Sequence, residues 1–137
     1  MATPMIKPLD PILGTIKKAT VVAIDELIDE EVTLLVDGTL VTCFASYLPY
    51  EVEVGRTYAV ELSLNLSEQY ETQRVSSTTV LIERIGSSFS YVLYGTLNNN
   101  SFKTFTLLAV DGIHHDHPDL NDSLIKLTVE RIDVAFL

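Results

Sequence analysis

Histidine is concentrated at one place in the sequence, where His114, His115 and His117 stand within four residues of one another. Imidazole is a common metal ligand and the one side chain that titrates near neutral pH without help from its surroundings. Asp116 and Asp119 stand beside the histidines, and zinc or nickel binds nitrogen and oxygen ligands of this kind. One function suggested by this segment is therefore that of a metal-binding protein, with zinc or nickel as its cofactor, which could act as a metal-dependent hydrolase.

The residues around the histidines favour a solvated loop over such a site. Residues 111–123 are rich in aspartate, asparagine, glycine and proline, which form turns and make a regular helix unfavourable. The chain contains no further histidine, and its single cysteine, Cys43, falls inside an expected strand. We therefore expect no cofactor. A further alternative is a pH-sensitive contact, because protonation of the imidazoles would cancel negative charge in this acidic loop.

A second group of ionisable residues is an acidic run in the first quarter of the chain. A calcium loop of the EF-hand type would need a central glycine and oxygen ligands at alternate positions, whereas Leu27 and Ile28 stand in the middle of this run. The run is typical of a solvated turn, and its functional alternative is a surface that binds a basic protein partner. The carboxylates concerned are those of Asp25, Glu26, Asp29, Glu30 and Glu31.

Aromatic residues on one expected hairpin suggest another kind of site. Tyr91, Tyr94 and Phe105 could stack on bases or sugars, as aromatic strand residues do in single-strand binders. Such sites also need a cationic groove, and Lys103 is the one basic residue on this hairpin. Core packing is therefore the favoured role. An OB-like protein that binds oligosaccharides or single-stranded nucleic acid remains an alternative function.

Charge and composition exclude several function classes. The chain carries 19 acidic and 9 basic residues, a net charge of −10, and its basic residues are scattered, so nucleic acid binding is disfavoured. The hydrophobic fraction of 47% leaves apolar surface for a protein partner or for a homo-oligomer. No run approaches the ~20 apolar residues of a membrane span. The lone cysteine also favours a reducing compartment, so we expect a cytoplasmic protein.

Hydrophobic alternation predicts an all-β chain. A two-residue turn at Asp37-Gly38 joins two expected strands, and residues 57–66 alternate most clearly. We expect an extended arm over residues 1–14 and a single domain over residues 15–137, with at most one short helix, near residues 67–74. The architecture is a small antiparallel barrel or sandwich of about 7–8 strands, with an OB-like barrel as one form. Strands are expected over residues 20–28, 32–36, 39–47, 57–66, 78–85, 88–97, 101–110 and 124–136.

Function is inferred mostly from what the sequence lacks. It contains no G-x-S-x-G motif and no phosphate-binding glycine loop, and a lone cysteine on a strand is usually a small buried hydrophobe. The sequence therefore favours a non-enzymatic protein. We expect a small acidic protein-binding or assembly module that self-associates.

Overall fold

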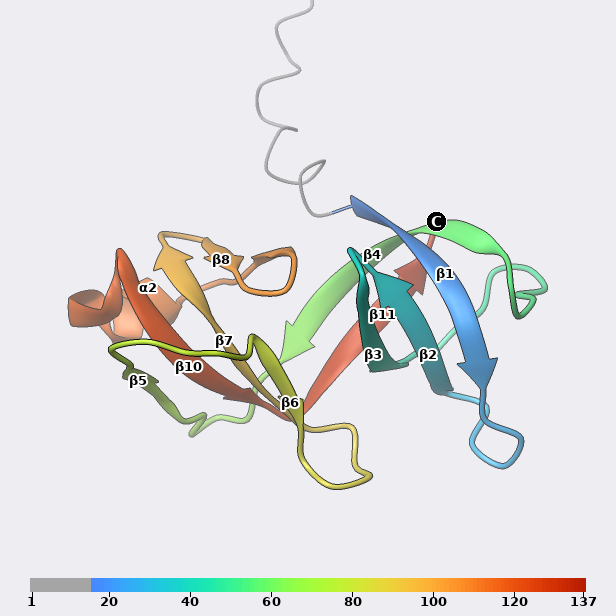
Figure 1. The fold of residues 1–137 in the computed structure, drawn as a ribbon, viewed down its shortest axis with the longest axis horizontal. Coiled ribbons are helices and arrows are strands. Elements are labelled where there is room, and N and C mark those ends of the chain that lie inside the picture. Colours follow the sequence, from blue (N-terminus) through green and yellow to red (C-terminus); the bar gives the residue numbers. More distant parts are fainter. Residues whose placement is uncertain (1–15) are drawn as a thin grey trace, which may run out of the picture.

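A computed structural model describes residues 16–137 of the chain. The extended arm expected over residues 1–14 therefore lies outside the described residues. Within the described part the protein is mostly β, with a closed five-stranded barrel and a separate six-stranded sheet (Figure 1). The barrel strands are β1 (Ile16–Ile24), β2 (Glu31–Val36), β3 (Thr39–Phe44), β4 (Thr57–Asn65) and β11 (Arg131–Phe136).

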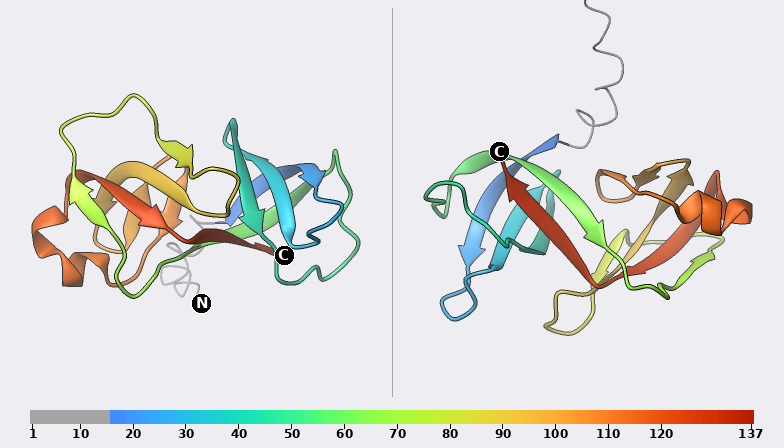
Figure 2. Two further views of the ribbon diagram at one scale, coloured as in Figure 1. Left: turned by 90° about the horizontal axis from the view of Figure 1, so that it is seen from below. Right: turned by 180° about the vertical axis from the view of Figure 1, so that it is seen from behind.

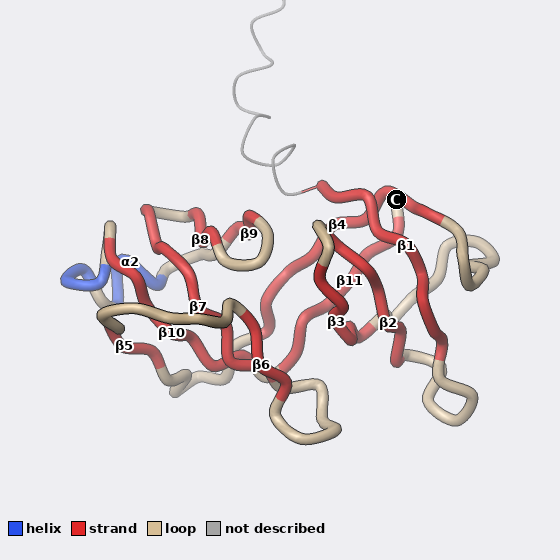
Figure 3. The backbone as a smooth tube through the Cα atoms, in the orientation of Figure 1, coloured by secondary structure: helices blue, strands red, loops and turns tan. Residues whose placement is uncertain are grey.

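The six-stranded sheet is formed by the chain between β4 and β11. Its strand order is β5-β10-β7-β8-β9, and β6 pairs with β7 beside β8. A short helix α2 (Ile113–Asp116) and a 3-10 turn η1 (Pro118–Leu120) connect β9 to β10, at the end of the sheet farthest from the barrel (Figure 3). The strands are β5 (Thr72–Arg74), β6 (Ile82–Arg84), β7 (Tyr91–Asn98), β8 (Ser101–Lys103), β9 (Leu107–Ala109) and β10 (Ser123–Val129).

The barrel confirms the all-β prediction and its strongest local signals. Val60 and Leu62 of β4 are buried and alternate with more exposed residues, as the periodicity of this segment predicts. Asp37 and Gly38 both adopt positive φ, 48° and 79°, which is the backbone geometry of a tight two-residue hairpin turn. Asp133 of β11 pairs with Phe44 of β3 in parallel, and this contact closes the barrel order β1-β2-β3-β11-β4.

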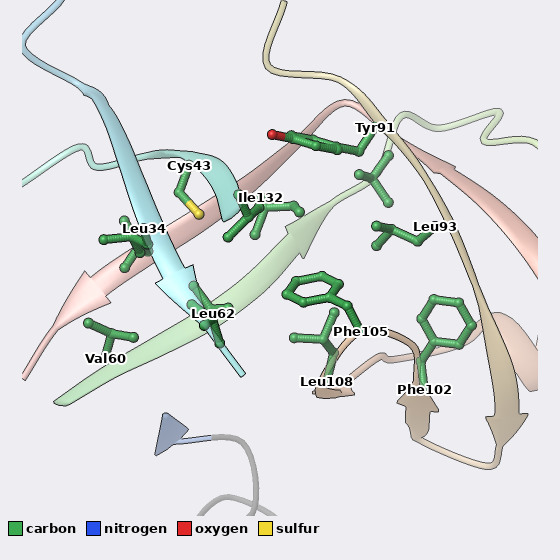
Figure 4. Packing of buried hydrophobic residues seen from close by; sticks show 14 of the residues in the cluster. Leu34, Cys43, Val60, Leu62, Tyr91, Leu93, Phe102, Phe105, Leu108 and Ile132 are labelled. Atoms are coloured by element: carbon green, nitrogen blue, oxygen red, sulfur yellow. The ribbon is translucent and has the colours of Figure 1, made fainter. Parts of the chain in front are cut away.

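The chain runs directly from one sheet into the other, and the two sheets share one hydrophobic core. The strand expected over residues 124–136 is divided at Glu130, so that β10 pairs with β7 and β11 pairs with β4 (Figure 2). The N–H of Thr42 in β3 donates to the Tyr91 hydroxyl of β7 at 2.8 Å, so the second sheet also contacts the barrel wall. Figure 4 shows barrel residues such as Leu62 and Ile132 packed in the same cluster as Leu93 and Phe105.

The close approach of β7 and β8 explains why position 95 is a glycine. A Cβ atom added at Gly95 of β7 would lie 2.2 Å from the backbone oxygen of Lys103 in β8. No side chain fits at that distance, because van der Waals contact between these atoms begins beyond 3 Å. Gly95 therefore permits the pairing of β7 with β8 that holds the fully buried Phe102 in the core.

Further sequence-based expectations differ from the structure in detail. The helix expected near residues 67–74 is wrong: β5 (Thr72–Arg74) occupies part of this segment, because pairing with the free edge of β10 outweighs the local helix signal at Ser67. In the part of the chain that the structure describes, the short helix α2 lies instead in the expected loop at 111–123, where Ile113 of α2 and Leu120 of η1 are buried in the core. The strand expected over 101–110 is divided into β8 and β9. Among the described residues, no helix is long and apolar enough to cross a membrane.

Candidate functional site

The histidine segment forms the short helix α2 and the residue that comes after it. The rings of His114 and His115 lie with their centroids 4.0 Å apart, whereas the ring of His117 makes an edge contact with Tyr70 at 5.7 Å. The Nδ1 atom of His114 is buried without a hydrogen-bond partner in the described part of the chain. The structure thus brings two histidines together and places the ring of the third against Tyr70.

The acidic residues beside these histidines take part in hydrogen bonds. The Asp116 carboxylate accepts the Tyr70 hydroxyl at 2.9 Å, and the backbone oxygen of Asp119 accepts the Arg74 guanidinium. Across residues 16–137, no group of three His, Cys, Asp or Glu side chains is placed to hold a metal ion. Within these residues, the side chains named for the alternative zinc or nickel site are therefore not gathered into a set of three ligands.

The acidic run forms the connection between β1 and β2, at the other end of the molecule from α2 (Figure 1). We call residues 25–31 the acidic loop. The Asp25 carboxylate accepts the backbone N–H groups of Leu27 and Ile28 at 2.9 and 2.8 Å, and this geometry fixes the turn. Glu26, Asp29 and Glu30 are exposed around it. Leu27 is 94% exposed, beside a hollow of about 340 Å³ that extends along the loop to Ala23 and Thr33.

The three aromatic residues proposed for stacking do not form one surface. Tyr91 and Phe105 are buried, 4% and 8% exposed, and pack in the hydrophobic core. Tyr94 lies on the opposite face of β7, where its hydroxyl donates to Glu83 Oε1 at 2.8 Å. This hydrogen bond is the main reason why the pKa of Tyr94 is raised. Of the three, Tyr94 alone presents its ring to a surface hollow.

That hollow is a groove of about 540 Å³ on the outer face of the six-stranded sheet. It unites residues from two segments that lie apart in the sequence: Tyr94 from the aromatic hairpin and His117 from the histidine segment. The tyrosine at its rim, Tyr70, was not expected to contribute. Burial, followed by the hydrogen bond to Asp116, raises the pKa of Tyr70 to about 12. The lining residues are Tyr70, Glu71, Thr72, Gln73, Ile85, Val92, Tyr94, His117, Lys126 and Thr128.

Cys43 lies inside the barrel, fully buried, as its position between Val41 and Ala45 predicts. Burial, with a smaller contribution from the charge of Asp133, raises the pKa of its thiol far above the usual value. A thiol reacts as a nucleophile through its thiolate, so burial disfavours the reaction of Cys43 in the folded protein. Its role is to fill space in the core.

Comparison with known proteins identifies a family. The family described as "Uncharacterised conserved protein UCP019853" matches residues 15–137, a range that includes every strand of both sheets. No curated protein and no solved structure matches the chain. The function of the chain must therefore be inferred from the geometry of its grooves and loops.

Proposed function

The chain belongs to this uncharacterised family, and we propose that it is a non-enzymatic binding and assembly module that docks a basic protein partner on its acidic loop. One observation carries the proposal: Leu27 is 94% exposed, more than any other large hydrophobic side chain in the described residues, and it is surrounded by carboxylates. An apolar side chain in this position is suited to enter a pocket on a partner, while the acids pair with basic groups at the rim.

The loop is held in one conformation before any partner binds. The two hydrogen bonds to the Asp25 carboxylate are supplemented by a bond from Asp25 N–H to the Glu31 oxygen at 3.0 Å and by one from Ala45 N–H to the Glu30 oxygen at 2.8 Å. A preformed loop loses little conformational freedom on binding, which favours affinity. The exposed acids also add to a net charge of −10, which speeds association with a basic partner.

The type of barrel supports a binding role for this loop. A five-stranded barrel whose order is β1-β2-β3-β11-β4 has the strand number of an OB-type barrel, the OB-like form expected from the sequence. In that fold the connection between the first two strands borders the binding surface. The acidic loop is this connection here.

Self-association is the second part of the proposal. Leu35 of β2 and Leu40 of β3 are cross-strand partners, and their side chains are 39% and 59% exposed on the outside of the barrel. A second copy carries the same pair, so a twofold contact would cover both. Because the copies share a negative charge, this contact should strengthen as salt screens their repulsion. Light scattering of the full chain at low and high salt checks this part, and a monomer under both conditions would contradict it.

The docking proposal is tested with a synthetic helical peptide that carries lysines on one face and leucines on the other. The triple variant Glu26→Gln, Asp29→Asn, Glu30→Gln removes three exposed carboxylates of the loop and leaves Asp25 in place. The variant Leu27→Ser removes the apolar group. A matched control, Glu51→Gln, Glu68→Gln, Asp111→Asn, makes the same change in net charge at three exposed acids elsewhere.

We expect fluorescence anisotropy to show at least about a tenfold rise in Kd for both loop variants, and binding that weakens as salt is raised. The control triple should bind within about twofold of the native chain, because rim charges elsewhere contribute little to affinity. Equal losses in the loop triple and the control triple would mean that net charge alone attracts the peptide. That result would overturn the docking site.

A further inference from the structure

The groove on the six-stranded sheet has the dimensions of a ligand site. Its volume of about 540 Å³ falls within the ~300–1,000 Å³ typical of small-molecule sites. A neighbouring hollow of about 290 Å³ shares four of its lining residues, so the two form one trough, which we call the sheet groove. The shared residues are Tyr70, Glu71, Ile85 and Thr128. The sheet groove and the acidic loop belong to different sheets, so a ligand in the groove and a partner on the loop would occupy separate surfaces.

The floor of the sheet groove is formed by side chains that strand pairing aligns. Lys126 of β10 stands opposite Gln73 of β5 on one side and opposite Tyr94 of β7 on the other. Directly opposed residues project from the same face of a sheet, so an amide, an ammonium group and a phenol ring form a row across three strands. In the next row of the same face, Thr128 stands opposite Val92 and adds a hydroxyl beside an apolar group.

Hydrogen bonds fix two tyrosine rings in the sheet groove. The hydroxyl of Tyr94 is held by Glu83 at 2.8 Å, and that of Tyr70 is held by Asp116 at 2.9 Å. The ring of Tyr70 also packs edge to face against His117, with an interplanar angle of 76°. Since their polar ends are engaged, the rings can offer their faces to a ligand without reorganisation.

The charged side chains in and around the sheet groove determine which kind of ligand it favours. Lys126 is half-buried, and its ammonium group has no ion-pair partner among residues 16–137. The carboxylates of Glu83 and Asp116 are engaged by the tyrosines, and Glu71 lies at the rim. The Lys126 ammonium group, without an ion-pair partner in these residues and with carboxylates nearby, is suited to a ligand with one anionic group. A polyphosphate chain would be repelled, because nucleic acid binding requires several basic contacts.

We propose that the sheet groove binds a short saccharide that carries a carboxylate. The apolar face of a sugar ring packs on Tyr94 or Tyr70, as ring faces do on aromatic side chains. The sugar hydroxyls exchange hydrogen bonds with Gln73 and Thr128, which supply a donor amide and a hydroxyl. The sugar carboxylate pairs with Lys126 in a charge-assisted hydrogen bond, an interaction that this ammonium group makes with no carboxylate of residues 16–137.

The test is an NMR titration of the isotope-labelled full chain with 3′-sialyllactose, which carries one carboxylate, with the neutral trisaccharide 3′-galactosyllactose and with a short oligothymidylate. The acidic sugar should shift the amide signals of Gln73, Tyr94, Lys126 and Thr128, with an affinity at least about tenfold higher than that of the neutral sugar. The oligothymidylate should not shift them. Shifts confined to other residues, or no shifts at millimolar sugar, would overturn the proposal.

Two variants separate the contribution of the Lys126 charge to sugar affinity from that of the Tyr94 ring. Lys126→Gln should reduce the affinity for the acidic sugar to that for the neutral one, whereas Tyr94→Ala should weaken both. Matched controls, Lys103→Gln and Tyr47→Ala, make the same changes at exposed positions outside the sheet groove and should bind normally. Equal affinity of the native chain for the two sugars would contradict the role of Lys126. Unchanged binding by Tyr94→Ala, with the chain folded, would contradict the role of the ring.

Discussion

Replacement of Gly95 by alanine should be among the most damaging single changes in the protein. The new Cβ atom would lie 2.2 Å from the Lys103 oxygen and 2.8 Å from the Thr104 Cα atom. Because Cβ contacts under 3.0 Å do not occur, the backbone of β8 must move away by about 1 Å. Neither neighbour is the flexible end of a side chain, so the strand as a whole has to shift.

The cost of that shift can be worked out from the contacts of β8. Overpacking of a close-packed region costs about 1–3 kcal/mol, and each weakened backbone hydrogen bond adds about 1 kcal/mol. Three residue pairs join β7 to β8, and Phe102 in the middle pair is fully buried. We therefore expect Gly95→Ala to lower the free energy of unfolding by about 3 kcal/mol, a large part of the stability of a typical domain.

Urea unfolding followed by circular dichroism measures this difference. Thr96→Ala is the matched control, because Thr96 is the exposed neighbour on the same strand and its change should cost less than about 1 kcal/mol. If Gly95→Ala unfolds at the same urea concentration as the native chain, the close approach of β7 and β8 is incorrect.

Three other outcomes are expected from the structure. Cys43 should resist thiol reagents at pH 8 until the protein unfolds, because burial keeps its thiol protonated; rapid labelling of native protein by Ellman's reagent would contradict this. Tyr70 has a folded pKa of about 12, above the ~10 of an unfolded tyrosine, so the stability that it contributes should be lost as pH rises from about 10 to about 12. In absorbance titrations, Asp116→Asn should lower that pKa, with Tyr70→Phe as the reference that identifies its signal. Asp25→Ala should cost about 1 kcal/mol in urea unfolding, because two loop N–H groups lose their acceptor, whereas Glu26→Gln should change little.

Local patterns predicted the parts of the fold that depend on neighbouring residues. The alternation of residues 57–66 identified β4 because one face of that strand is buried and the other is not. Asp37-Gly38 identified the turn between β2 and β3, since few residues adopt positive φ at low cost. The burial of Cys43 was predicted by the same strand periodicity.

Features that depend on pairing between distant segments were not readable from the sequence. The break at Glu130, which sends one expected strand into two sheets, is set by pairing with β7 on one side and with β4 on the other. The row of Gln73, Lys126 and Tyr94 likewise exists only through the register of three strands. No local pattern encodes that register.

One signal in the sequence was sufficient to correct the aromatic site. Tyr91 and Tyr94 are three positions apart, and residues at odd spacing point to opposite faces of a strand. They could not therefore form one stacking surface, and the structure places Tyr91 in the core and Tyr94 in the sheet groove. The alternation of Lys126 with the buried Ile125 and Leu127 likewise indicated an outward-facing lysine.

The most direct test of the proposed function is to locate the basic amphipathic peptide on the labelled full chain by NMR. If the peptide docks on the acidic loop, the amide signals that shift on binding are those of residues 24–33, around the exposed Leu27, and the shifts shrink as salt is raised. Shifts spread evenly over acidic residues of both sheets, or centred on the sheet groove, would contradict the acidic loop as the docking site.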